Sequence, residues 1–126
     1  MHRLLAHEAP DADLAAMIVW VEMLPEDGEA DVEALAGEMT DRRIGWFHDP
    51  KRRAGQAIAA SLGAPGKVVW DVYLFFGAGA EWNDQPPAPL QWVHQLGDSW
   101  ADRTRHHFGD QLEPELSRLL KSLLGR

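Results

Sequence analysis

The stretch Val68–Phe76 reads VVWDVYLFF and is the most apolar run of the chain. Nine residues rich in β-branched and aromatic side chains predict a buried strand of the kind found in a parallel sheet. Asp71 interrupts this run. A carboxylate inside such a strand is costly unless it is paired or reaches the edge of a cleft. Asp71 is therefore the first candidate for a functional residue.

Strands and helices alternate on both sides of this run. The β-branched run Met17–Leu24 and the short segment Arg43–His48 predict two further strands. Apolar spacing and capping residues predict helices at residues 1–8, 31–39, 50–62 and 113–124, a further helix begun by Asp98 or Ser99, and a short edge strand at residues 80–82. This alternation predicts one α/β domain over residues 1–126. We expect the three strands to share one sheet, with Val68–Phe76 central and largely parallel to its neighbours.

The composition excludes several classes of function. The chain has 20 acidic and 12 basic residues, a net charge of −8, which disfavours binding to nucleic acid or to an anionic membrane. It has no cysteine, so thiolate catalysis and cysteine metal sites are excluded within it. No stretch approaches the roughly 20 apolar residues of a membrane helix, and no signal peptide is recognisable. We expect a soluble, cytoplasmic protein that uses no cofactor.

The order of segments from Ile18 to Trp82 resembles the second half of a redoxin. Redoxins are the branch of the thioredoxin-like superfamily that includes peroxiredoxins and thiol–disulfide oxidoreductases. The resemblance is carried by IVWVEML, DVEALAGEM, IGWFHDP, RRAGQAIAASLG and DVYLFFGAGAEW. It implies a thioredoxin-like mixed sheet, mostly parallel at its centre with an antiparallel edge hairpin, flanked by helices.

The chain departs from this family at the redox site. The family's first central strand and the cysteine turn after it would precede Met1, and the family's cis-proline is replaced by Asp71 in the overlay. The chain is then a shortened relative, a domain whose true start lies upstream, or a domain that has lost redox chemistry. A missing central strand would leave apolar surface and an unfilled position in the sheet. We therefore expect a homodimer, joined through strands or through tryptophan-rich faces.

Polar side chains that are candidates for chemistry are few. Asp71 is either a structural carboxylate bonded to an indole, an arginine or a histidine, or a general base or metal ligand acting with His48 or His94. We favour the structural role. His94 lies among apolar residues and is expected to be a satisfied, half-buried histidine. No histidine spacing matches a metal motif, so no metal site is predicted.

Six tryptophans are many for 126 residues. Trp46, Trp70 and Trp92 are candidates for a ligand-binding aromatic pocket, although large aromatic residues also serve as core packing.

Three functions remain open from the sequence. The first is a redox-inactive thioredoxin-like domain that binds a protein partner or a small ligand. The second is a small enzyme that uses Asp71 with His48 or His94 as an acid–base or metal site. The third is a truncated oxidoreductase of the redoxin type.

Overall fold

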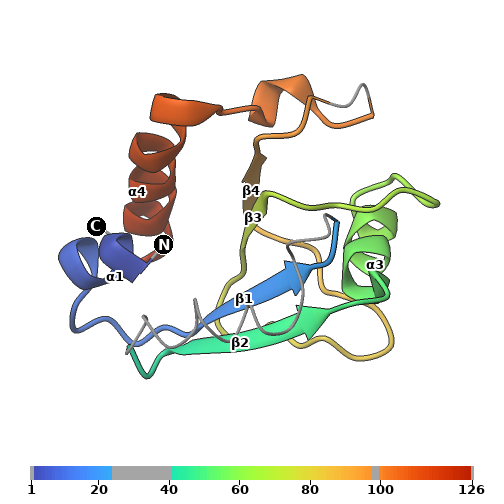
Figure 1. Cartoon of the computed structure of the whole chain (residues 1–126). Coiled ribbons are helices and arrows are strands. Elements are labelled where there is room, and N and C mark those ends of the chain that lie inside the picture. The colour runs from blue at the N-terminus through green and yellow to red at the C-terminus, as the bar shows by residue number, and fades with distance from the viewer. Residues whose placement is uncertain (1, 24–40, 98–99, 126) are drawn as a thin grey trace.

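The computed structural model describes residues 2–23, 41–97 and 100–125 of the chain (Figure 1). These residues form a mixed α/β structure with the elements α1 (His2–Glu8), β1 (Ala16–Val21), β2 (Ile44–Asp49), α3 (Arg53–Ser61), β3 (Val72–Phe75), β4 (Gln91–His94), the short 3-10 helices η2 (Arg103–Arg105) and η3 (Gly109–Gln111), and α4 (Leu112–Leu123). The helix predicted at residues 31–39 and the capping roles predicted for Asp98 and Ser99 lie outside the described residues.

The strands form two separate pairs. β1 and β2 are parallel, with a register that runs from Ala16 opposite Ile44 to Val21 opposite Asp49. β3 and β4 are antiparallel, and Val72 lies opposite His94. The prediction of one sheet with a central, parallel third strand is wrong for the described residues, because β3 pairs there only with β4. Residues 80–82, predicted to form an edge strand, are not in a strand.

The third strand is shorter than predicted because the backbone turns at Asp71. Asp71 has a φ of 55°, in the left-handed region that a strand cannot use. The residues before it lie against α3, and the N–H of Val69 donates to the carbonyl of Gly55 at 3.1 Å. A Cβ atom on Gly55 would lie 2.8 Å from Cγ1 of Val68, so only glycine permits this contact. Val68 and Val69 therefore pack against α3 instead of extending the sheet.

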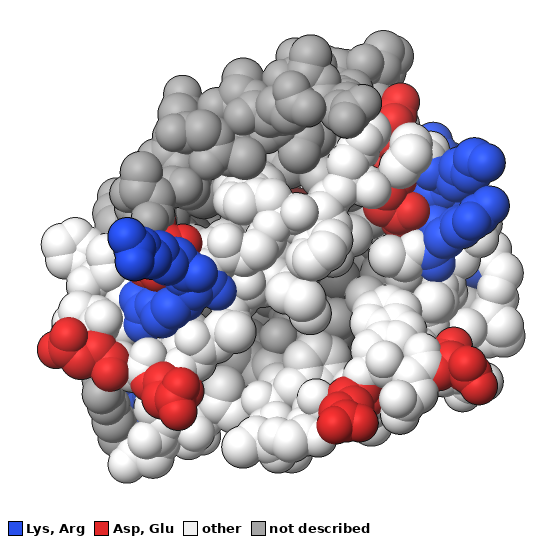
Figure 2. Space-filling model, turned by 90° about the horizontal axis from the view of Figure 1, so that it is seen from below, with Lys and Arg blue, Asp and Glu red and all other residues white. Residues whose placement is uncertain are grey.

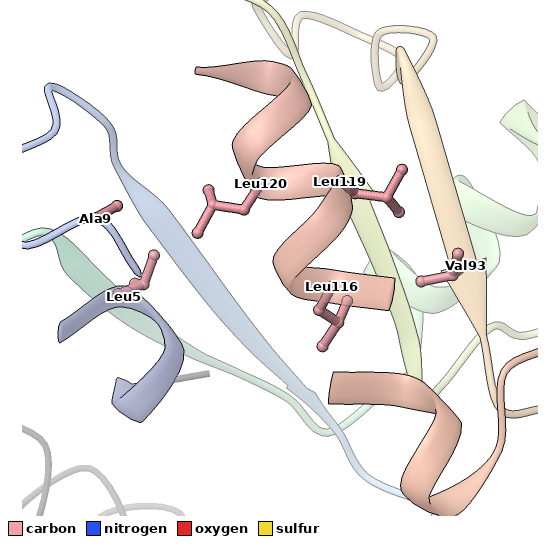
Figure 3. Close-up of a cluster of buried hydrophobic side chains, with 6 residues drawn as sticks. All are labelled: Leu5, Ala9, Val93, Leu116, Leu119 and Leu120. Atoms are coloured by element: carbon pink, nitrogen blue, oxygen red, sulfur yellow. The ribbon is translucent and has the colours of Figure 1, made fainter. Parts of the chain in front are cut away.

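The buried core lies between α1, α4 and β4 (Figure 3). Its side chains are Leu5, Ala9, Val93, Leu116, Leu119 and Leu120. The three leucines of α4 follow the spacing of one helical face, and this helix begins one residue before its predicted start. Full burial of a leucine side chain contributes about 1.5–3 kcal/mol, so these three residues are a main source of stability.

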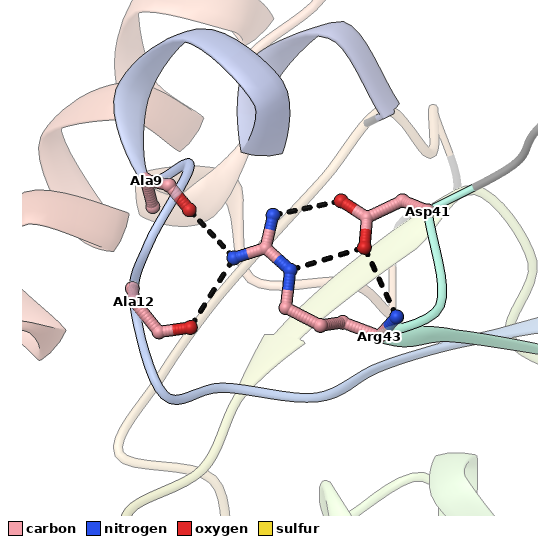
Figure 4. A network of polar contacts seen from close by, with 4 residues as sticks. All are labelled: Ala9, Ala12, Asp41 and Arg43. Atoms are coloured by element: carbon pink, nitrogen blue, oxygen red, sulfur yellow. Dashed lines mark hydrogen bonds and ion pairs between the residues drawn. The ribbon is translucent and has the colours of Figure 1, made fainter.

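Arg43 fastens the end of α1 to the start of β2 (Figure 4). Its Nη1 donates to the carbonyl oxygen of Ala9 at 2.6 Å and to that of Ala12 at 3.3 Å. Its Nε and Nη2 donate to the two carboxylate oxygens of Asp41 at 3.0 and 2.7 Å. The hydrogen bonds that Arg43 donates to the Asp41 carboxylate raise the pKa of Arg43 above its ordinary value. One side chain thus joins the helical core to the parallel strand pair.

Neither β1 nor β3 contains a fully buried residue, although both are apolar in sequence. All four residues of β3 are half-buried, and the side chain of Met17 in β1 is 67% exposed. Within the described residues, no helix is long and apolar enough to span a membrane.

Candidate functional site

Asp71 lies at the start of β3 and is tied to the segment that follows β4. Its Oδ1 accepts hydrogen bonds from Nε2 of Gln95 at 2.9 Å and from the hydroxyl of Tyr73 at 3.3 Å. Its carbonyl accepts the N–H of Gln95 at 3.1 Å. Oε1 of Gln95 in turn accepts the N–H of Gly109 at 3.1 Å. The partners are a phenol and an amide, so the prediction of an indole, an arginine or a histidine is wrong.

The Asp71 carboxylate changes the acidity of its phenol partner. Burial, followed by the negative charge of Asp71 and the hydrogen bond to it, raises the pKa of Tyr73 to about 12. The phenol therefore stays protonated at neutral pH and acts as a donor to the carboxylate. This arrangement stabilises the turn at Asp71.

His94 is buried, with 1% of its surface exposed. Its Nε2 lies 2.7 Å from the carbonyl oxygen of Asp102, so this nitrogen carries the proton and donates it. Its Nδ1 accepts the N–H of Leu96 at 3.0 Å. Both ring nitrogens are therefore bonded to the backbone. His94 is the satisfied histidine that the sequence predicted, and it is more deeply buried than expected.

His48 lies near the carboxyl end of β2 and is paired with a residue that the sequence analysis missed. Its Nε2 is 3.1 Å from Oε2 of Glu22, which follows the end of β1. Both side chains are partly exposed. Ligands of open α/β sheets gather at such carboxyl ends of parallel strands. A carboxylate that orients an imidazole is a common acid–base arrangement.

Two further polar residues organise the same end of the strand pair. Asp49 is buried and accepts the N–H groups of Arg53, Ala54 and Gly55 at 2.8, 2.9 and 3.2 Å, so it caps α3. Arg52 has a φ of 58° and donates through Nε to the carbonyl of Glu22 at 2.9 Å. Asp49 was not predicted to have this role, although an aspartate in the turn before a helix is a capping signal.

The three predicted catalytic residues do not form one cluster. His48 bonds to Glu22, Asp71 bonds to Tyr73 and Gln95, and His94 bonds to backbone groups. Among the residues that the structure describes, no three histidine or acidic side chains are grouped so as to hold a metal ion. Among the described residues, His48 is the predicted histidine whose side chain contacts an acidic side chain, that of Glu22.

The three predicted tryptophans lie on different segments and make different contacts. Trp46 in β2 is half-buried, and its Nε1 has no hydrogen-bond partner in the described part of the chain. Trp70 is exposed just before β3. Trp92 in β4 lies under the guanidinium of Arg105, which is 5.1 Å from the ring centre and contributes a cation–π contact. An aromatic pocket formed by all three stays a prediction.

An apolar surface covers one face of the β1–β2 pair. Met17 and Phe47, 67% and 53% exposed, lie on the same face, because their register partners are Gly45 and Val19. The Phe47 ring lies beside Gly45, where a Cβ atom would be 3.4 Å from it. Figure 2 views the molecule from the side where β1 and β2 lie, and most of the described surface between its two groups of Lys and Arg is uncharged. We call Met17, Val19, Gly45 and Phe47 the strand-pair face.

Comparison with protein-family models, with characterised proteins and with solved structures finds no match for this chain.

Proposed function

We propose that this chain is a thioredoxin-like domain without redox chemistry that acts by binding a protein partner, and that it forms a homodimer. The observation that carries the proposal is the strand-pair face. Parallel strands normally have both faces covered, and two strands alone are marginally stable in water. A parallel pair with exposed Met17 and Phe47 is therefore expected to be covered by another chain.

The polar residues support a binding role over a catalytic one. Asp71 and His94, two of the three candidate catalytic residues, are engaged in contacts that hold the fold. The chain carries no cysteine for thiol–disulfide exchange. The chain then acts by binding a partner, and its exposed apolar side chains supply the contact area.

Sedimentation of the wild-type protein and of two matched variants tests the proposal. Phe47→Glu places a charge on the strand-pair face, and Phe108→Glu places the same charge at a position that is 65% exposed elsewhere. We expect the wild type and Phe108→Glu to sediment as dimers at high micromolar concentration and Phe47→Glu as a monomer. A compact wild-type monomer overturns the dimer, and equal behaviour of the two variants overturns the role of the face.

A second candidate function is acid–base catalysis by His48 and Glu22. The 3.1 Å contact between Nε2 and Oε2 supports it, because the carboxylate fixes the orientation of the imidazole. Hydrolysis of activated esters and phosphoesters is the test. Loss of turnover in both His48→Gln and Glu22→Gln, but not in His107→Gln, would support catalysis. The same turnover in all three variants rules it out.

The third alternative, a truncated redoxin-type oxidoreductase, is tested at the gene. An in-frame strand that ends in cysteine upstream of Met1 would place the redox chemistry in residues that precede this chain. A stop codon directly upstream contradicts that alternative.

A further inference from the structure

Residues 102–107, which we call the strap, lie along the edge of β4 that faces away from β3. The carbonyl oxygen of His94 accepts the N–H of His107 at 3.0 Å, and that of Trp92 accepts Nη1 of Arg105 at 3.2 Å. The strap thus satisfies backbone groups of β4 that β3 does not reach. A strand edge that loses such a cover is open to pairing with another strand.

The side chain of His94 holds the strap in one protonation state only. The residue is 1% exposed, its Nε2 donates to the carbonyl oxygen of Asp102, and its Nδ1 accepts the N–H of Leu96. Nδ1 accepts a hydrogen bond only while it carries no proton, so the two bonds fit the neutral imidazole. A proton added to Nδ1 would point at the N–H of Leu96, and two donors would then face each other.

The basic side chains near His94 oppose a positive charge on its ring. The ring of His106, an exposed residue, has its centre 5.5 Å from that of His94. The guanidinium of Arg105 lies over the ring of Trp92, whose centre is 5.6 Å from that of His94. His107 is the next imidazole of the strap, and its Nδ1 lies 3.4 Å from the carbonyl oxygen of Arg105. Acidification charges imidazoles, so it adds positive charge around a site built for a neutral ring.

Among the described residues, no carboxylate bonds to His94 in compensation. The Asp102 side chain accepts the hydroxyl and the N–H of Thr104 at 2.6 and 3.0 Å, and these bonds hold the pKa of Asp102 below its ordinary value. Asp102 therefore stays ionised in weakly acidic solution, where its own titration does not loosen the strap. The carboxylate of Asp71, at the start of β3, is bonded to the two side chains described above. Asp98, in the loop before the strap, lies outside the described residues.

We propose that the strap is an acid-released cover for the edge of β4 and that His94 takes up the proton. In weakly acidic solution the imidazolium gives up its bond from Leu96 and turns to water, and the strap leaves β4. The carbonyl oxygens of Trp92 and His94 are then uncovered, so this edge becomes able to pair with another strand. The device depends neither on the proposed homodimer nor on catalysis by His48.

The size of the response follows from proton linkage. An imidazole released into water takes up a proton near pH 6.5, whereas the bonded imidazole under the closed strap stays neutral. The open form therefore binds more protons than the closed form, and closure is strongest above pH 6.5 and weakens as the pH falls below it. The ratio of open to closed strap then rises about 30-fold between pH 7.5 and pH 5.0.

Amide hydrogen exchange on the wild-type chain measures this ratio. Each exchange rate is divided by the rate expected for the unfolded sequence at the same pH, so that protection alone is compared. We expect protection of the His107 amide to fall about 30-fold from pH 7.5 to pH 5.0. Unchanged protection overturns the proposal.

Low concentrations of urea separate opening of the strap from unfolding of the whole chain. Urea promotes an opening in proportion to the surface that it exposes. We therefore expect urea to lower protection at Leu119 and Leu120 in the core helix α4 and to leave that of the His107 amide nearly unchanged. Equal protection and an equal response to urea at all three amides would show that the strap opens only when the fold does, and this overturns the proposal.

Two matched variants identify the group that takes up the proton. His94→Gln keeps a donor for Asp102 but does not titrate, and His106→Gln removes the neighbouring imidazole of the strap. We expect protection of the amide at position 107 to be nearly the same at both pH values in His94→Gln and to fall about 30-fold in His106→Gln. A wild-type response in His94→Gln, or its loss in His106→Gln, overturns the role of His94.

The nitrogen NMR signals of the imidazole decide the matter on the wild-type chain if His94→Gln fails to hold the strap at pH 7.5. We expect the closed form to show a neutral His94 ring with its proton on Nε2 at both pH values. A charged His94 ring at pH 5.0 under a strap that is still protected would show that the closed site accepts the imidazolium, and this overturns the proposal.

Discussion

Oδ1 of Asp71 accepts a 2.9 Å hydrogen bond from the side-chain amide of Gln95, and these residues are separated by 24 positions in the chain. The bond closes the open end of the β3–β4 pair. It also connects the pair to η3, because Gln95 accepts the N–H of Gly109. The Asp71 carboxylate, in the most apolar stretch of the sequence, thus joins the start of β3 to the segment after β4. Asp71 also has a left-handed backbone conformation that few side chains tolerate.

Substitutions at Asp71 separate the hydrogen bonds from the backbone turn. The amide introduced by Asp71→Asn retains an acceptor oxygen, and asparagine tolerates the left-handed conformation. We therefore expect Asp71→Asn to lower the free energy of unfolding by about 1 kcal/mol or less. Asp71→Ala loses the acceptor and is strained at a φ of 55°, and we expect a loss of about 2–3 kcal/mol. Urea unfolding measures both. Equal stability of the alanine variant and the wild type contradicts the structural role.

Tyr73 makes the free energy of unfolding depend on pH in the alkaline range. The pKa of its phenol is raised from 10.0 to about 12 in the folded chain, first by burial and then by Asp71. Between these values the folded state keeps a proton that the unfolded state has released. Stability from this group is therefore complete below pH 10 and declines as the pH rises from about 10 to 12. Because the chain has a single tyrosine, its ultraviolet titration reports this pKa without interference. In Asp71→Asn we expect the pKa to fall but to stay above 10.

The elements that follow simple apolar periodicity could be predicted from the sequence. The leucine spacing of α4 gives its position within one residue, and the β-branched run at Met17 gives a strand that pairs in parallel with the segment before Asp49. His94 could be assigned as a satisfied histidine because apolar residues flank it. In each case the neighbours along the chain carry the information.

Contacts that depend on register between distant segments could not be predicted. Glu22 meets His48 across 26 residues only because β1 and β2 are parallel and aligned. Gln95 meets Asp71 because β3 and β4 are antiparallel, and no strand was predicted at the residues that form β4. The positive φ of Asp71 shortens β3, and hydropathy carries no signal for a backbone angle.

Gly55 is expected to tolerate no larger residue. The Cβ atom of Gly55→Ala would lie 2.8 Å from Cγ1 of Val68 and 2.9 Å from the carbonyl oxygen of Val69. Alanine favours a helix over glycine by about 1 kcal/mol, but such overpacking costs about 1–3 kcal/mol. We expect net destabilisation in thermal unfolding, whereas Gln56→Ala, on the exposed side of the same helix, leaves stability nearly unchanged. A more stable Gly55→Ala variant would show that segment 68–69 does not lie against α3.

His94 holds the segment from Asp102 to His107 against β4 through its Nε2, and its Nδ1 accepts the N–H of Leu96 just after β4. In His94→Leu the carbonyl of Asp102 and the N–H of Leu96 lose their partners inside the protein, and each buried group left unpaired costs about 1–3 kcal/mol.

His94→Asn and His94→Gln separate the two contacts. The oxygen of the asparagine side chain lies at the distance of Nδ1 and is able to accept from Leu96, whereas the glutamine amide reaches the distance of Nε2 and is able to donate to Asp102. We therefore expect both amides to be more stable than His94→Leu and less stable than the wild type. Amide hydrogen exchange should show lost protection at His107, whose N–H donates to the His94 carbonyl, in His94→Leu. Retained protection there, with stability equal to the wild type, would show that the backbone bridge alone holds the segment in place.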